Sequence, residues 1–235
     1  MSFGNVSAVL VHGAWADGSS WSKVIEGLKE QGIDALAAPL PLTSLSEDVA
    51  ALDRTLERIE GPVVLAGHAY AGAVIGSSRS EKIRALVYVA ALAPDEGETV
   101  GDVFYRGETH PQAPQLAPDR HGLIWLPQEA FAQAFAQHAT PLELAVLAAV
   151  QRPISVSCIG EAVGRPLWRD RPSWFLIAEQ DRMINPVTQH FMAGRMNAYL
   201  RSYLADHTPI VTAPDAVTHV IAEAVQSVLP GNVIR

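Results

Sequence analysis

Residues 63–75 read VVLAGHAYAGAVI, and this stretch decides the fold. Val63 to Ala66 form a short apolar run after a Gly-Pro pair, which is typical of a central strand in a parallel sheet. Residues 71–75 then begin a helix whose first turn carries almost no side-chain bulk. Small residues crowd the intervening turn because the strand and helix backbones must nearly touch there. The stretch therefore predicts a buried strand that runs directly into a helix.

The composition indicates a globular protein that does not bind polyanions. Apolar residues make up 49% of the 235 residues, which is enough for one α/β domain with a sizeable core. The formal net charge of −8 argues against nucleic acid or an anionic membrane as a partner. Cys158 is the single cysteine, so an internal disulfide is ruled out. Residues 1–5 lack the basic start and apolar core of a secretion signal, so a cytoplasmic location is the default expectation.

Apolar strands alternate with helical segments through the first 93 residues and again from residue 172. Strands are expected at residues 7–11, 33–38, 63–66, 85–92, 173–178 and 200–205. Helices are expected between them, including one over residues 185–199 and a last one over residues 215–229. This alternation predicts an α/β fold with about six mainly parallel strands, helices on both faces and a single domain over residues 1–235.

Residues 94–171 interrupt this alternation and are expected to form a helical lid inserted into a core of residues 1–93 and 172–235. Prolines recur in this segment, and two short helical patterns span residues 127–138 and 141–150. Its large apolar side chains either line a pocket under the lid or only attach the segment to the sheet. The substrate-binding candidates are Trp125, Phe131, Phe135 and Trp168 from this segment, with Trp15 and His68 from the top of the sheet.

Four features follow the carboxyl ends of expected strands, where open α/β sheets hold their ligands. They are the sequence H-G-A-W at residues 12–15, the turn at residues 67–72, Asp181 and His207. The turn resembles the G-x-S-x-G nucleophile elbow of the α/β hydrolases, and the order of turn, acid and histidine is that of the same family. The H-G-A-W sequence and the D-R-x-I-x-P pattern at residues 181–186 resemble the small esterase and hydroxynitrile-lyase-like branch of this family.

The turn departs from the family pattern at two positions. Elbows of this branch usually read G-H-S-Y-G-G, whereas this chain reads G-H-A-Y-A-G. Ala69 thus occupies the position of the nucleophilic serine. Ala71 replaces the closing glycine of the motif, although Gly72 follows it. The chain is therefore expected to keep the scaffold of a catalytic turn without its nucleophile.

The resemblance implies a role for each of the other site residues. His207 is the implied base, Asp181 is the carboxylate that orients it, and the backbone N–H groups of Ala14 and Tyr70 are the implied oxyanion hole. Read from the residues alone, Asp181 is also compatible with an ordinary loop carboxylate, and His207 competes with seven other histidines. The sequence has no zinc-site spacing, phosphate loop or dinucleotide glycine pattern, so neither a metal nor a cofactor is expected.

Three functional hypotheses stay open because an alanine side chain cannot attack a carbonyl. The first is a carboxylic ester hydrolase for a small, largely apolar substrate, in which Ala69 is an engineered replacement of the serine. The second is a natural relative that binds a small ligand without turning it over. The third is a lyase or water-activating enzyme in which His207 and Asp181 provide a general base without a serine. In each case the partner is a small molecule, and a homodimer is left open.

Overall fold

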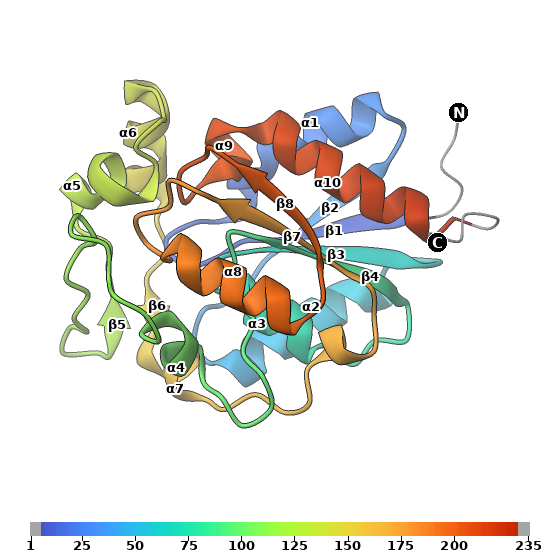
Figure 1. Cartoon of the computed structure of the whole chain (residues 1–235), viewed down its shortest axis with the longest axis horizontal. Coiled ribbons are helices and arrows are strands. Elements are labelled where there is room, and N and C mark those ends of the chain that lie inside the picture. Colours follow the sequence, from blue (N-terminus) through green and yellow to red (C-terminus); the bar gives the residue numbers. More distant parts are fainter. Residues whose placement is uncertain (1–5, 230–235) are drawn as a thin grey trace.

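The computed structural model describes residues 6–229, and a six-stranded sheet lies at its centre (Figure 1). All six strands are parallel, in the order β2-β1-β3-β4-β7-β8. The predicted α/β-hydrolase fold is confirmed. The sequence expectation for residues 1–5 lies outside the described residues. The strands are β1 Ser7–Val11, β2 Asp34–Ala38, β3 Val63–His68, β4 Ile83–Val89, β7 Ser173–Ala178 and β8 Tyr199–Tyr203.

Helices cover both faces of the sheet, as the alternating pattern predicts. The strand order reverses direction between β2 and β3, so right-handed crossovers place α1 on one face and α2, α3 and α8 on the other. Figure 1 shows α1 and α10 together on the upper face. β3 and β7 are buried at every position because both of their faces are covered. The helices are α1 Ser22–Glu30, α2 Leu45–Glu57, α3 Ala71–Ser77, α8 Pro186–Arg195 and α10 Pro214–Ser227.

The segment between β4 and β7 contributes no strand to the sheet, and its α5 and α6 region lies beyond the carboxyl ends of the strands (Figure 1). Two short strands in it, β5 and β6, pair antiparallel with each other. Within residues 6–229, no helix is long and apolar enough to span a membrane. The segment contains α4 Val100–Phe104, β5 Leu123–Ile124, α5 Gln128–Ala130, the π-helical turn η2 Phe131–Phe135, α6 Pro141–Val150, β6 Ile154–Ser155, α7 Val156–Gly160 and the 3₁₀ turn η3 Leu167–Arg169.

Element ends differ from the sequence expectation where the backbone turns left-handed. The helix expected to reach Tyr199 ends at Arg195, because Asn197 adopts a φ of 49° and closes the helix. The N–H of Ala198 then donates to the carbonyl of Ala193 at 3.1 Å, as in a Schellman cap. The fourth strand likewise ends at Val89, before Ala90 with its φ of 43°. The remaining short helices are η1 Gly18–Trp21 and α9 Pro209–Thr212.

Candidate functional site

The turn between β3 and α3 holds Ala69 in a left-handed backbone conformation. Its φ is 51°, a region that costs a residue with a Cβ roughly 1–2 kcal/mol. The N–H of Ala69 donates to the carbonyl of Val89 at 3.3 Å, and its own carbonyl accepts the N–H groups of Leu92 at 2.9 Å and Gly72 at 3.1 Å. These bonds tie the strained turn to the chain that leaves β4.

Two glycines allow other backbone segments to approach this turn. A Cβ on Gly72 would lie 2.3 Å from the carbonyl oxygen of Leu92, which leaves no room for any side chain there. A Cβ on Gly13 would lie 3.0 Å from the Cβ of Ala69. The close approach behind the turn therefore falls at Gly72, one position after the closing glycine of the family motif. This explains why Ala71, although fully buried, is accommodated.

The structure brings Asp181 and His207 together, although 26 residues separate them in the chain. Asp181 follows the end of β7, and His207 lies in the loop between β8 and α9. The Nδ1 atom of His207 lies 2.8 Å from Oδ2 of Asp181, and both side chains are buried. Because a carboxylate only accepts, Nδ1 carries the hydrogen and Nε2 is left as the free nitrogen of the neutral ring.

Three further donors compensate the buried carboxylate of Asp181. Its Oδ1 accepts the backbone N–H groups of Met183 at 2.7 Å and Ile184 at 2.9 Å. Its Oδ2 also accepts the side-chain amide of Gln189 at 2.8 Å. The carbonyl oxygen of that amide accepts the N–H of Ala178 at 3.1 Å, so the amide orientation is fixed. Asp181 is therefore held rigidly as an acceptor for His207.

His68 supports the loop that carries His207. Its Nε2–H donates to the backbone carbonyl of His207 at 2.7 Å, and its ring centroid lies 5.0 Å from that of the His207 imidazole. Burial, and then repulsion from His207 in its protonated form, lower the pKa of His68 to about 3, so its ring is neutral at physiological pH. His68 is not among the residues that line the cavity described below, so its expected contact with substrate stays a prediction.

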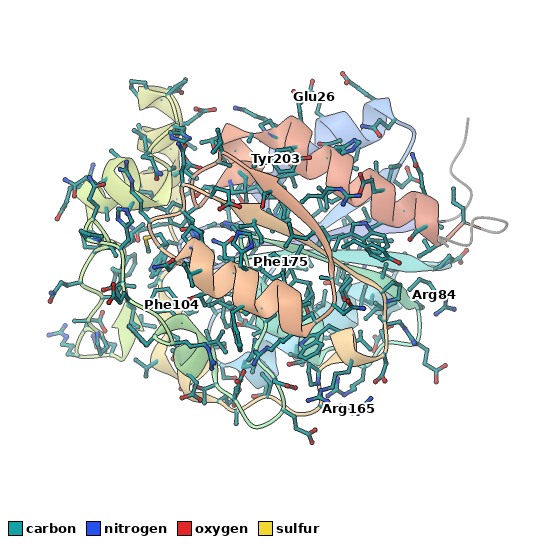
Figure 2. All side chains as sticks on the ribbon, viewed as in Figure 1. Glu26, Arg84, Phe104, Arg165, Phe175 and Tyr203 are labelled. Atoms are coloured by element: carbon teal, nitrogen blue, oxygen red, sulfur yellow. The ribbon has the colours of Figure 1, made fainter. Side chains whose placement is uncertain are left out.

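An apolar cavity lies between the turn, the H-G-A-W loop and the inserted segment. It measures about 60 Å³ as space open to the centre of a water molecule, against the roughly 10–15 Å³ that one water needs on this measure. Among residues 6–229, no aspartate, glutamate, lysine or arginine lines it. Figure 2 places Phe104, one of its walls, at the end of the molecule formed by the insertion. The lining residues are Ala14, Trp15, Ala69, Tyr70, Leu92, Val100, Phe104, Tyr105, Leu116, Ile124, Ile154, Ile159, Met183, Ile184 and His207.

Two backbone donors at the cavity wall have no partner. Neither the N–H of Ala14 nor that of Tyr70 donates a hydrogen bond to any other residue in the range 6–229. The next residue, Trp15, is anchored instead, because its backbone N–H donates to Arg152 at 2.9 Å and its indole N–H to Ile124 at 2.9 Å. Ala14 and Tyr70 thus leave two N–H groups available to an oxygen atom in the cavity.

The described lining of the cavity offers no aliphatic hydroxyl or thiol in place of a nucleophilic serine. Among the described residues, no serine, threonine or cysteine lines it. The hydroxyls of Ser19 and Ser20 are used by Asp17, as donors to its side chain at 2.6 Å and to its backbone carbonyl at 2.6 Å respectively. Ser78, the residue directly after α3, donates to Asp53 at 2.5 Å.

The aromatic substrate-binding candidates of the insertion lie outside the cavity lining. Phe135 is fully buried and packs its ring against His207, with a centroid distance of 5.3 Å, and edge-on against Trp15 at 6.1 Å. Phe131 packs behind it, with ring centroids 5.4 Å apart. These two rings therefore support the site from behind, and of the six substrate-binding candidates only Trp15 lines the cavity.

Trp125 and Trp168 lie farther from the expected position. Trp125 is 48% exposed and donates its indole N–H to Asp119 at 3.3 Å. Trp168 is buried near the end of α3, where its indole N–H donates to the carbonyl of Pro94 at 3.3 Å. An aromatic residue in a covering segment can pack against the sheet, a neighbouring helix or solvent, and composition does not distinguish these outcomes.

Gln189 and Asp48 are polar residues that the sequence reasoning missed. Gln189 fixes Asp181, and Asp48 accepts a hydrogen bond from the side chain of Tyr70. Each lies on the buried face of its helix, α8 or α2. A polar residue at helical spacing within an apolar stripe was the available signal. Within residues 6–229, no group of three or more histidine, cysteine, aspartate or glutamate side chains is arranged to hold a metal ion.

A comparison with protein-family models matches residues 8–220 to the model described as Alpha/beta hydrolase family. The chain belongs to this family. A comparison with curated protein sequences finds no match. The match spans both halves of the sheet, the insertion, Asp181 and His207, so this α/β hydrolase carries the family's fold over nearly its whole described length.

Solved structures of other α/β hydrolases superpose on this α/β hydrolase over most of its length. A pyrethroid hydrolase from Sphingobium faniae JZ-2 is 20% identical, with a TM-score of 0.79 over 95% of this chain and 98% of its own. Polyneuridine aldehyde esterase is 17% identical, with a TM-score of 0.76 over 93% and 98% of the two chains. A methylesterase from Arabidopsis is 16% identical, with a TM-score of 0.76 over 94% and 99%. At these identities the likeness shows the fold alone.

Proposed function

We propose that this α/β hydrolase takes a small, uncharged and largely apolar carboxylic ester into the cavity beside Ala69, beneath the insertion as a lid. Ala69 holds the family's nucleophile position in this proposal, because it sits at the left-handed tip of the turn between β3 and α3. The esterase and hydrolase activities named for structural neighbours are consistent with an ester as the ligand. The apolar lining, which among the described residues includes no aspartate, glutamate, lysine or arginine, favours a neutral substrate.

One observation carries the proposal. His207 is held by Asp181 and lines the same cavity as Ala69 and the two unpartnered N–H groups of Ala14 and Tyr70. A base with a free nitrogen in the same cavity as two available N–H donors suits attack on a carbonyl carbon, since the donors stabilise the negative oxygen that forms. His207 and Tyr105 are the lining side chains that could exchange a proton with a ligand, because the Tyr70 hydroxyl is used by Asp48.

Without a hydroxyl at residue 69, water is the nucleophile that the site can activate. The water oxygen bonds to the carbonyl carbon while its proton passes to Nε2 of His207, and the carbonyl oxygen becomes an oxyanion held by Ala14 and Tyr70. The bond to the alcohol then breaks, and the alcohol takes the proton from His207. Loss of a triad serine typically costs about 10⁶ in turnover and leaves roughly 10³–10⁴ over the uncatalysed rate, so slow hydrolysis is expected.

The absence of any serine, threonine or cysteine from the described cavity lining also favours a second function, in which the protein binds the ester without turning it over. A hydrolysis assay of the Ala69 protein with 4-nitrophenyl acetate distinguishes slow ester hydrolysis from binding without turnover. Slow, saturable hydrolysis without an acyl-enzyme burst or an acylated protein mass supports water activation. This rate should disappear in His207→Ala and persist in His219→Ala, an exposed histidine on α10.

Quenching of tryptophan fluorescence gives the matching binding measurement, because Trp15 lines the cavity. Saturable binding of a short alkyl ester with no turnover that depends on His207 would support the binding protein. If the protein neither binds nor hydrolyses any short-chain or aromatic ester, both proposed functions are overturned. Tight binding only to polyanions would contradict the neutral, apolar character proposed for the ligand.

A further inference from the structure

A buried carboxyl group lies behind the turn and takes no part in the site described above. Asp48 belongs to α2, is fully buried and does not line the cavity. Its Oδ2 accepts the phenol O–H of Tyr70 at 2.7 Å and the thiol of Cys158 at 3.6 Å. Its Oδ1 accepts the backbone N–H of Leu42 at 2.7 Å. One side chain thus connects the turn, the insertion and the loop after β2.

Asp48 also supports part of the cavity wall. Leu42 has a φ of 60°, and its carbonyl accepts the N–H of Ser155 at 3.0 Å. Ser155 follows Ile154 in β6, and Ile154 lines the cavity. Removal of the carboxylate would leave the buried N–H of Leu42 without its partner, which is costly in a protein interior. The carboxylate therefore stabilises a loop with a backbone conformation that is rare for leucine.

Hydrogen-bond donors surround the carboxylate of Asp48, and no cationic side chain among the described residues contacts it. Burial raises the pKa of Asp48, while its hydrogen bonds from Tyr70, Leu42 and Cys158 oppose that shift. Burial also raises the pKa of the Cys158 thiol to about 12, so this group remains a donor. No lysine, arginine or histidine in the range 6–229 forms an ion pair with Asp48. Without an ion-pair partner, the buried carboxylate is held by its three hydrogen-bond donors, and these are the groups that it orients.

We propose that Asp48 is a positioning residue that fixes the backbone N–H of Tyr70 toward the cavity. Tyr70 is held at both ends: its peptide follows the strained residue Ala69, and its hydroxyl is tied to Asp48. A side chain fixed at its tip restricts the backbone torsions that aim its own N–H. The inference rests on the proposed function, because the aimed N–H matters for chemistry only when a negative oxygen forms in the cavity.

The kinetic consequence is specific. A donor that acts on the oxyanion stabilises the transition state more than bound substrate, so its misalignment lowers kcat and leaves KM nearly unchanged. Complete loss of one such donor typically costs about 10²–10³ in kcat. Because Tyr70 keeps its N–H after the tether is cut, we expect a decrease of roughly tenfold, below that limit.

The test compares Tyr70→Phe and Asp48→Asn with Ser78→Ala. Ser78→Ala is a matched control, because it removes another hydroxyl-to-carboxylate bond, here partly buried, between the α3 region and α2 and away from the cavity. In the Ala69→Ser background with 4-nitrophenyl acetate, Tyr70→Phe and Asp48→Asn should lower kcat at constant KM. The kcat of the double variant should be no lower than that of the slower single variant, because both substitutions remove the same hydrogen bond between Tyr70 and Asp48. Ser78→Ala should keep kcat.

A second measurement does not depend on ester hydrolysis. In ¹⁵N–¹H spectra of the Ala69 protein, Asp48→Asn should shift or broaden the Tyr70 amide signal, whereas Ser78→Ala should not. An inactive Ala69→Ser protein would overturn the proposed ester chemistry, while the amide signal would still decide whether Asp48 positions Tyr70. An unmoved Tyr70 amide in folded Asp48→Asn would overturn the positioning role. Equal kcat losses in Tyr70→Phe and Ser78→Ala would overturn it as well.

Discussion

The imidazole of His207 and the carboxylate of Asp181 are joined by a hydrogen bond of 2.8 Å between Nδ1 and Oδ2. Both groups are buried, and every other polar neighbour of the carboxylate is a donor. The pair therefore fixes one tautomer of His207, with the hydrogen on Nδ1 and the bare Nε2 available to a ligand. This relationship is the basis for proposing that His207 acts as a base.

Replacement of Asp181 by asparagine should abolish most hydrolysis by the Ala69→Ser protein. An asparagine amide facing Nδ1 would favour the opposite tautomer and place the hydrogen on Nε2, where it blocks proton uptake. The analogous change in a catalytic triad costs about 10⁴ in kcat. Steady-state kinetics with 4-nitrophenyl acetate measure the effect, with Asp215→Asn at the start of α10 as a control that keeps kcat. An unchanged kcat in folded Asp181→Asn would remove the base from the proposed mechanism.

Gly72→Ala should destabilise the fold because the new methyl group meets backbone. Its Cβ would lie 2.3 Å from the carbonyl oxygen of Leu92, and overpacking of this kind typically costs about 1–3 kcal/mol or more. Gly194→Ala is the matched control, because a Cβ there meets nothing within 4 Å inside α8. That substitution should stabilise by roughly 0.5–1 kcal/mol. Urea unfolding measures both, and equal effects of the two substitutions would contradict the close approach at Gly72.

The stability of the protein should fall in mildly acidic solution, partly through His68. Burial lowers the pKa of folded His68 from 6.5 to about 3. Between those values the unfolded chain binds a proton that the folded protein does not, so the contribution is complete above pH 6.5 and declines as pH falls toward 3. The slope of the unfolding free energy from this one group reaches at most about 1.4 kcal/mol per pH unit.

His68→Gln should therefore reduce the dependence of stability on pH. Urea unfolding at several values between pH 7.5 and 4.5 gives the slope for each protein, and comparison with the unsubstituted chain cancels groups common to both. His219→Gln, an exposed histidine, serves as the control and should leave the slope nearly unchanged. The same slope in the His68→Gln and unsubstituted proteins would mean that His68 is not held neutral by the fold.

The sequence predicts the sheet and the place of the site because both depend on local patterns. The apolar run at residues 63–66 and the small residues after it specify a strand and a close-packed helix in any chain of this type. Asp181 and His207 each follow a strand, and parallel strands bring their carboxyl ends to one edge. Where a residue with a left-handed backbone such as Asn197 ends a helix, the apolar pattern continues past the end of the helix. The sequence then predicts a helix that is too long.

The lining of the cavity was harder to predict because it depends on packing between distant segments. Phe135 and Trp168 are aromatic and buried, but neither lines the cavity. Phe135 packs against the ring of His207, and Trp168 packs near the end of α3. Aliphatic residues such as Ile154 and Ile159 line the cavity instead, and nothing in their local sequence distinguishes them from core residues. Asp48 and Gln189 interrupt apolar helix faces, but their partners are 22 and 8 residues away and become visible only in the fold.

Conversion of Ala69 to serine tests the central claim most directly. The added oxygen would lie at the left-handed tip of the turn, in the cavity shared by His207, Ala14 and Tyr70. We predict a gain in hydrolysis of 4-nitrophenyl acetate of roughly 10³-fold or more, within the ~10⁶ that a triad serine provides. We also predict covalent labelling of residue 69 by diisopropyl fluorophosphate, located by peptide mass, with both properties lost when His207→Ala is added. A folded Ala69→Ser protein that neither hydrolyses the ester nor takes the label would contradict the assignment of residue 69 as the nucleophile position.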